Sequence, residues 1–186
     1  MKKLEWIVLD DTMVAESGSD SFVILYDRYF TRVYNYIRYR CADAVEADDL
    51  TAQVFLKALV NLEKYDPEKA PFEPWLFTIA RNLLNDNFRK KRRYYLVNIE
   101  DVEHILSHSN RPIEEKIERN EQKYRLLECV KNLSNRRQDL IALKFGANMT
   151  NREIAKLTGL SEQNVGVILH RGIKKLRKTM QEDNVQ

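Results

Sequence analysis

The sequence predicts an all-α protein of two small helical domains joined by a flexible acidic linker, the second domain being a helix-turn-helix. Only 5 Gly and 4 Pro occur among 186 residues and 32% of the residues are charged, a composition typical of helices rather than of strands and turns. Apolar residues recur at steps of three and four positions, the spacing of one helical face. An acidic stretch without this period divides the chain, although the chain length alone would also allow a single domain.

The first half of the chain predicts three amphipathic helices that close one core. The first spans about 21–40, with its apolar residues on one face. The second begins near Ala47 and ends near residues 65–67, with one side apolar and the other polar. Its polar side carries Asp48, Asp49, Gln53 and Lys57. Trp75 opens the third helix, which ends in the basic run 89–95.

The segment 97–112 is polar, acidic and without a sustained period, so we interpret it as a linker. The predicted division is a first domain over 1–95, a linker over 96–111 and a second domain over 112–186. At ~3.3–3.6 Å per residue, about sixteen residues reach roughly 50–58 Å, more than one ~34 Å turn of duplex DNA. Two tethered modules can therefore contact one DNA molecule together.

The second half begins with a further helical stripe over about 113–133. A helix N-capped by Ser134 is expected to follow and to end at Gly146.

A helix-turn-helix pattern occupies the last part of the chain. Thr150 and Glu153 fit a capping box at the start of a short helix, and Gly159 supplies the turn after it. Ser161 caps a longer helix that runs to about Lys178. A short helix, a glycine turn and a longer basic helix form the arrangement that places the second helix in the major groove of DNA.

The last helix carries the first set of candidate DNA contacts. The net charge of +3 identifies no partner, but the stretch from Arg171 to Lys178 holds five basic residues and no acid. The alternative interpretation is an ordinary helical hairpin whose basic side is exposed to solvent and contacts no DNA. Gln and Asn suit adenine edges, whereas Arg suits guanine or phosphate. The candidates are Ser161, Gln163, Asn164, Val167, His170, Arg171, Lys174 and Lys175.

A second constellation lies in the third helix of the first half. Aromatic side chains precede a basic run there, a combination that suits stacking of exposed bases beside a phosphate backbone, as in single-stranded nucleic acid binding. The candidates are Trp75, Arg81, Asn82, Asp86, Arg89, Lys90, Arg92 and Arg93. A core position is the competing interpretation of Trp75. The run 89–93 favours a polyanionic partner because five like charges repel one another.

Other chemistry finds no support in the sequence. Cys41 and Cys129 lack a metal-like companion, so we expect buried free thiols and no metal. A glycine-rich phosphate loop, and a nucleophile with a nearby base, are both missing, so we expect neither a cofactor nor an active site. No apolar run reaches membrane-spanning length, which predicts a cytoplasmic protein without membrane insertion.

Two linked motifs in the first half resemble a known family. Residues 46–58 read EADDLTAQVFLKA and residues 72–82 read FEPWLFTIARN. They are similar to region 2 of the extracytoplasmic-function (ECF) sigma factors of bacterial RNA polymerase. The helix with Ile154 and Ala155, the turn at Gly159 and the following basic helix resemble region 4 of that family.

The resemblance implies a role for each set of residues. The polar side of the second helix corresponds to the surface that docks on core RNA polymerase, at the clamp helices of the beta-prime subunit. The segment from Trp75 to Arg93 corresponds to the part that melts and captures the minus-ten element, and the last helix to the reader of the minus-thirty-five element. It further implies a contact with the beta flap, promoter DNA as ligand, and control by an anti-sigma factor.

Two departures from the family pattern concern specificity and docking. Gln163-Asn164-Val165 and then Val167-Ile168 stand where members commonly show Gly-Thr-Val and Ser-Arg, which bears on the upstream sequence read and not on the fold. Ala52-Gln53 replaces the customary Gln-Glu in the docking helix. A helix-turn-helix regulator that binds duplex DNA without polymerase is the main rival function, and an enzyme or interaction module with solvated basic faces is the other.

Overall fold

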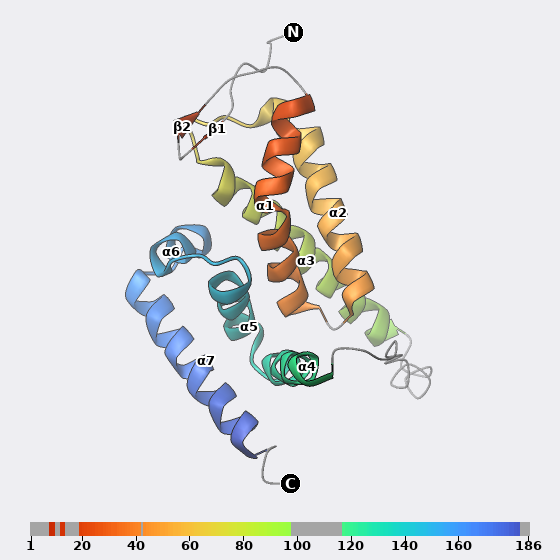
Figure 1. The fold of residues 1–186 in the computed structure, drawn as a ribbon, viewed down its shortest axis with the longest axis vertical. Coiled ribbons are helices and arrows are strands. Elements are labelled where there is room, and N and C mark those ends of the chain that lie inside the picture. The colour runs from red at the N-terminus through yellow and green to blue at the C-terminus, as the bar shows by residue number, and fades with distance from the viewer. Residues whose placement is uncertain (1–7, 10–11, 14–18, 42, 98–116, 183–186) are drawn as a thin grey trace.

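The computed structural model describes residues 8–9, 12–13, 19–41, 43–97 and 117–182 (Figure 1). Its first helical domain consists of α1 (Ser19–Arg40), α2 (Ala44–Asn61), a 3-10 turn η1 (Leu62–Lys64) and α3 (Phe72–Val97). A short antiparallel pair, β1 (Val8–Leu9) and β2 (Thr12–Met13), precedes them.

The three helices of the first domain close one core, as the sequence predicts. Val33 and Ile37 of α1, Val54 of α2, and Leu76 and Phe77 of α3 are fully buried against one another's helices. Asp43 begins α2 by accepting a hydrogen bond from the backbone N–H of Val45 at 3.2 Å. The apolar periodicity thus fixes which side of each helix faces inward.

The second domain contains α4 (Ile117–Lys131), α5 (Asn135–Ile141), a π-helical turn η3 (Ala142–Gly146), α6 (Asn151–Thr158) and α7 (Glu162–Glu182). Helices α4, α5 and α6 all pack against α7. Leu140, Ile141 and Leu143 from the middle of the domain are buried, and so is Ile154 of α6.

Several predicted boundaries shift. The third helix begins at Phe72 rather than Trp75, because Pro74 then lies in the first turn, where a missing N–H costs nothing. The same helix runs through Val97, so the first two residues of the predicted linker are helical. Ser134 occupies the N-cap position and helical structure continues to Gly146, as predicted. Two details differ: the Ser134 side chain makes no capping bond, and the α-helix changes after Ile141 to the π-helical turn.

The all-α prediction is confirmed, with the four-residue β pair as its one exception among the described residues. Within the helices that the structure describes, none is long and apolar enough to cross a membrane.

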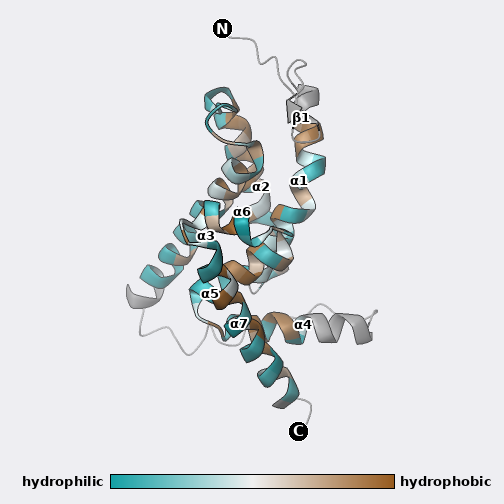
Figure 2. Ribbon diagram, turned by 90° about the vertical axis from the view of Figure 1, so that its left-hand side faces the viewer, coloured by the Kyte–Doolittle hydropathy of each residue, from teal (hydrophilic) through white to brown (hydrophobic). Residues whose placement is uncertain are grey.

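The two domains contact each other directly. The turn η3 and helix α5 lie against α1, and α6 lies against α3. The buried apolar residues of both domains form one continuous cluster. In Figure 2, hydrophobic residues gather near the centre of the molecule, where α5 lies, whereas hydrophilic residues prevail along α7. Helix α2 lies on the side of α1 that faces away from the second domain (Figure 1).

Candidate nucleic-acid interface

Local capping positions the two helices of the helix-turn-helix. The Thr150 hydroxyl accepts a hydrogen bond from the backbone N–H of Glu153 at 3.2 Å, and the Glu153 carboxylate accepts one from the backbone N–H of Thr150 at 2.7 Å. The bond from the Thr150 backbone N–H, helped by a second that the Thr150 hydroxyl donates at 2.8 Å, holds the pKa of the Glu153 carboxyl below its usual range. Gly159 ends α6 in the left-handed conformation, with φ of 73°, and Ser161 accepts from the N–H of Asn164 at 3.2 Å to start α7. The predicted capping box and glycine turn are confirmed.

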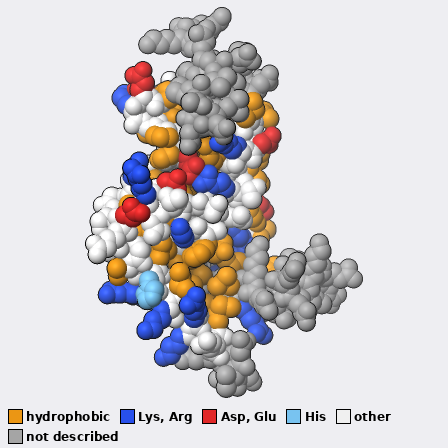
Figure 3. All heavy atoms as spheres, turned by 60° about the vertical axis from the view of Figure 1, so that its left-hand side comes forward, with side chains coloured by type: hydrophobic (Ala, Val, Ile, Leu, Met, Phe, Trp, Pro, Cys, Tyr) orange, Lys and Arg blue, Asp and Glu red, His pale blue; other side chains and the backbone are white. Residues whose placement is uncertain are grey.

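Helix α7 buries one side and exposes the other. Val165, Leu169 and Leu176 are buried against the rest of the domain. The exposed side, together with Ser161 just before the helix, is called the reading face. It carries all eight predicted residues: Ser161, Gln163, Asn164, Val167, His170, Arg171, Lys174 and Lys175. Lys and Arg side chains gather over the lower part of the molecule, where α7 lies (Figure 3). The reading face therefore presents amide and guanidinium groups to any ligand approaching from outside.

Trp75 packs as part of the first domain's aromatic cluster. Its ring centroid lies 4.9 Å from that of Tyr65 and 5.4 Å from that of Phe72. The side chain is partly buried. This arrangement agrees with the core interpretation of Trp75, although part of the residue remains accessible.

The remaining candidates on α3 are exposed, except Arg81, which is partly buried: Asn82, Asp86, Arg89, Lys90, Arg92 and Arg93. Within the basic run, two cations already have carboxylate partners. Arg89 pairs with Asp86 at 3.1 Å, and Lys91 pairs with Glu46 of α2 at 2.5 Å. Repulsion within the run is therefore partly relieved by the protein itself. Lys90, Arg92 and Arg93 are therefore the members of the run that most favour a polyanionic partner.

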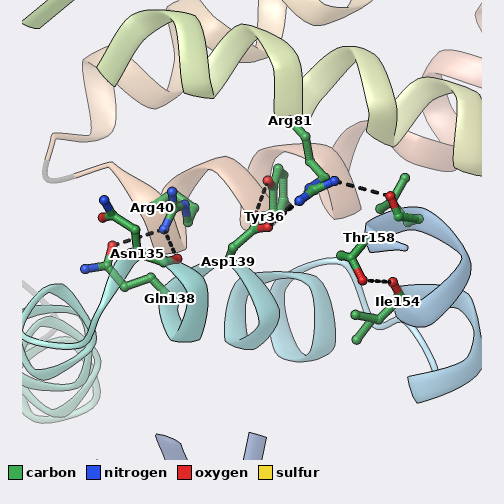
Figure 4. A network of polar contacts seen from close by, with 9 residues as sticks. Tyr36, Arg40, Arg81, Asn135, Gln138, Asp139, Ile154 and Thr158 are labelled. Carbon is green, nitrogen blue, oxygen red and sulfur yellow. Dashed lines mark hydrogen bonds and ion pairs between the residues drawn. The ribbon is translucent and has the colours of Figure 1, made fainter. Parts of the chain in front are cut away.

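Arg81 contacts the second domain. Its Nη2 lies 2.9 Å and its Nε 3.2 Å from Oδ2 of Asp139 on α5, and its Nη1 donates a longer bond of 3.3 Å to the Leu157 carbonyl. Tyr36 of α1 donates to the other oxygen of Asp139 at 2.8 Å. Figure 4 shows Arg81 and Tyr36 pointing toward Asp139 from two helices of the first domain. Sequence reasoning assigned Arg81 to DNA and gave Asp139 no role.

The four predicted docking residues Asp48, Asp49, Gln53 and Lys57 are all exposed on α2. The same helix also exposes a set of apolar side chains that the sequence analysis did not single out. These are Val45, Leu56, Leu59 and Val60, of which Val60 is 69% exposed. We call these eight residues together the α2 stripe. An exposed apolar group rimmed by polar side chains is typical of a protein-binding surface. The sequence contains a signal for these four residues: they are apolar, yet they fall outside the three- and four-residue spacing of the helix's buried side.

The described residues carry little that suggests other chemistry. Both cysteines are buried and neither forms a disulfide, as predicted, and burial raises the pKa of the Cys41 thiol to about 12. Among the residues that the structure describes, no group of three or more His, Cys, Asp or Glu side chains could hold a metal ion. What the arrangement offers is an amide-rich basic helix, a second basic helix and a mixed apolar and polar stripe.

Comparisons with known proteins give the family. The model of sigma-70 region 2 matches residues 25–94, and that of sigma-70 region 4 matches residues 123–176. The ECF RNA polymerase sigma factor BldN of Streptomyces coelicolor is 30% identical over 171 residues, which cover 91% of this chain and 64% of BldN. The chain thus spans somewhat less than two thirds of the length of that relative.

Two further relatives are matched over nearly their whole length. The ECF sigma factor SigW of Bacillus subtilis is 25% identical over 91% of this chain and 94% of SigW. The structure of the sigma factor RpoE in complex with the anti-sigma factor NepR from Bartonella quintana shares the fold, with a TM-score of 0.71 and 17% identity. That likeness covers 88% of this chain and 98% of RpoE. The chain therefore belongs to the ECF sigma factors of the sigma-70 family.

Proposed function

We propose that this chain binds core RNA polymerase and directs it to promoters. In this proposal the first domain, 1–95, docks on polymerase and captures the melted minus-ten element, and the second, 112–186, reads the minus-thirty-five element. The observation that carries it is the reading face of α7, which exposes amide and basic side chains in one continuous register while the opposite side is buried.

The α2 stripe is the proposed polymerase surface, in contact with the clamp helices of the beta-prime subunit. Its apolar members supply area that loses water on binding, and Asp48, Asp49, Gln53 and Lys57 fix partner and register through polar contacts. The second domain is proposed to contact the beta flap. These contacts would distinguish a polymerase subunit from a regulator that binds duplex DNA by itself.

The proposed mechanism is strand capture by binding energy. Exposed cations on α3 track the phosphate backbone, and bases separated from the duplex are held beside Trp75 and Asn82. Binding the melted strand more tightly than the duplex shifts the equilibrium toward the open promoter. The chain acts without catalysing a reaction, and nucleotide chemistry belongs to other polymerase subunits. It would work where polymerase works, in the cytoplasm.

An anti-sigma factor is the second proposed protein partner. Support comes from the RpoE structure, a complex with the anti-sigma factor NepR, and from the ECF membership of this chain. A partner that covers either the α2 stripe or the reading face would prevent promoter recognition.

Run-off transcription with purified core polymerase tests the proposed function. A sigma factor should give defined transcripts from genomic fragments and should bind promoter DNA tightly only in the presence of core enzyme. A helix-turn-helix regulator would bind duplex DNA equally well without polymerase. Failure to produce any transcript from genomic fragments would contradict the proposal.

Single substitutions test the division of labour between the domains. Arg171→Ala or Lys174→Ala should weaken upstream DNA binding by the holoenzyme, whereas Asp49→Ala or Gln53→Ala should weaken polymerase binding and leave DNA contacts intact. Lys69→Ala and Glu68→Ala are matched controls for the three charged test positions, because they change the charge by the same amount in the loop before α3, outside both surfaces. Equal promoter-bound polymerase for all four test variants would refute this division.

A further inference from the structure

One exposed apolar side chain lies in the middle of the reading face. Val167 is 40% exposed, whereas every other large apolar side chain of α7, over its described residues 162–181, is buried or partly buried. A valine exposed to water adds no burial energy, and a β-branched residue is a poorer helix former than alanine. The packing of the domain therefore gives no reason for valine at this position.

Helix geometry directs Val167 away from the core of the domain. Successive residues of an α-helix turn by about 100°, because 3.6 residues make one turn. Val167 is two positions from both Val165 and Leu169, so its side chain is turned by about 200° from each of these buried residues. Val167 thus lies at the centre of the exposed side, where a duplex lying against α7 comes closest.

Polar side chains surround Val167 on the same side of the helix. Gln163 and Asn164 lie one turn before it, and His170 and Arg171 lie one turn after it, at steps of three and four positions. All four are exposed, and no residue that the structure describes forms a hydrogen bond or ion pair with their side chains. Their hydrogen-bonding groups are available to a ligand, and Val167 is the apolar point between them.

The surroundings of Val167 favour DNA over a protein as its partner. From Arg171 to Lys178 the helix carries five basic residues and no acid, which attracts a polyanion. A protein-binding surface needs several apolar side chains that lose water together, as on the α2 stripe. Over residues 162–181, α7 exposes one large apolar side chain. A single valine within a basic face is matched better by a groove of DNA.

The major groove of DNA presents one kind of apolar group. Thymine carries a methyl group at C5, whereas the other distinguishing groups along the base edges donate or accept hydrogen bonds. The side chain of Val167 does neither, so a polar base edge packed against it would lose water without gaining a bond. Against a thymine methyl group, both partners bury apolar surface.

We propose that Val167 is a specificity-determining residue that selects a thymine in the upstream element by packing against its C5 methyl group. That thymine lies within about two base pairs of the bases that Gln163 and Asn164 contact, because one helical turn rises ~5.4 Å and stacked base pairs are ~3.4 Å apart. The inference rests on the proposed function for the place of α7 in the major groove. It adds the base feature that the centre of the reading face recognises.

Uracil scanning isolates this methyl group, because uracil is thymine without it. The duplex is selected from a random pool, once by the full-length chain bound to core polymerase and once by the chain alone. Each thymine of the selected site, on either strand, is then replaced by uracil, and the dissociation constant is measured by fluorescence anisotropy. For the wild type we expect about fourfold weaker binding at one thymine, the loss for one buried methyl-sized group.

Three variants assign that loss to Val167. Val167→Ala should weaken binding to the thymine duplex by about fourfold or more and bring the ratio between the uracil and thymine dissociation constants to about one, because the partner of the methyl group is gone. Gln163→Ala should weaken binding but keep the ratio near four, because its amide contacts another base. Val23→Ala is the matched control and should change neither value: this valine is 56% exposed on α1, outside the reading face and the α2 stripe.

The outcomes separate this inference from the proposed function. Equal affinity for thymine and uracil at every position of the site would overturn the inference, and so would a ratio that Val167→Ala leaves unchanged, since Val167 would then act in folding or on a protein. Selection of no sequence by either form of the chain would overturn it as well, because no base is then read. A site selected by the chain alone, without a run-off transcript from core polymerase, would contradict the proposed function, whereas the uracil ratio on that site would still support or overturn the role of Val167.

Discussion

Removal of the Tyr36 hydroxyl measures how strongly the two domains hold each other. Tyr36 is 1% exposed and donates to Asp139 at 2.8 Å, so Tyr36→Phe keeps the packed ring and deletes only one bond. A hydrogen bond to a charged acceptor contributes about 1.5–3 kcal/mol. We expect the free energy of unfolding, measured in urea, to fall by about that amount.

Tyr65→Phe is the matched control for this prediction. Its hydroxyl donates to the neutral Ala70 carbonyl at 2.8 Å, within the first domain. A bond between neutral groups contributes about 0.5–1.5 kcal/mol, so the loss should be smaller and should leave the interdomain contact intact. A double-mutant cycle between Tyr36→Phe and Asp139→Asn should then give a coupling free energy, because the two side chains share one bond. A Tyr36→Phe loss no larger than that of Tyr65→Phe, with no coupling to Asp139, would refute the reasoning.

The same hydroxyl predicts a dependence of stability on alkaline pH. Burial, and next the negative charge of Asp139, raise the pKa of Tyr36 well above its ordinary value of 10.0. A raised folded-state pKa means that the stabilisation is complete below pH 10.0 and is lost as the pH rises from there toward the folded-state pKa. Unfolding free energies measured between pH 9 and 11 should therefore fall less steeply for Tyr36→Phe than for the wild type.

Three further predictions concern the helix-turn-helix and the basic run. Thr150→Ala should lower the free energy of unfolding by about 1 kcal/mol through loss of the capping bond. The folded-state pKa of Glu153 is lowered, so the difference in unfolding free energy between the wild type and Thr150→Ala should disappear as acid protonates Glu153. Gly159→Ala should lower the free energy of unfolding in urea by about 1–2 kcal/mol. Backbone strain is the sole cause, because φ is 73° and a Cβ there would meet nothing within 4 Å. Gly159→Asn should lower it less. Arg92→Ala should reduce the slope of log affinity against log salt for single-stranded DNA by about 0.7, provided that Arg92 contacts one phosphate; an unchanged slope would exclude that contact.

The helices were predictable because their signals are local. The steps of three and four positions identified the buried sides of α1, α2 and α7, and the capping box at Thr150 and the glycine at 159 set both ends of α6. The boundary errors have local causes too. Trp75 was predicted to open α3, but the helix begins at Phe72 because it accepts Pro74 in its first turn. The π-helical turn after Ile141 leaves no signature in the apolar period.

The interdomain contact could not be predicted from the sequence. Gly146 was interpreted as the end of a helix, whereas its missing side chain serves an approach to Asn35, more than a hundred positions earlier. Arg81 meets a carboxylate 58 positions away, and nothing in the local pattern around Asp139 marks it as that partner. The exposed apolar members of the α2 stripe were missed for a simpler reason: a search for charged and amide groups passes over Leu56 and Val60.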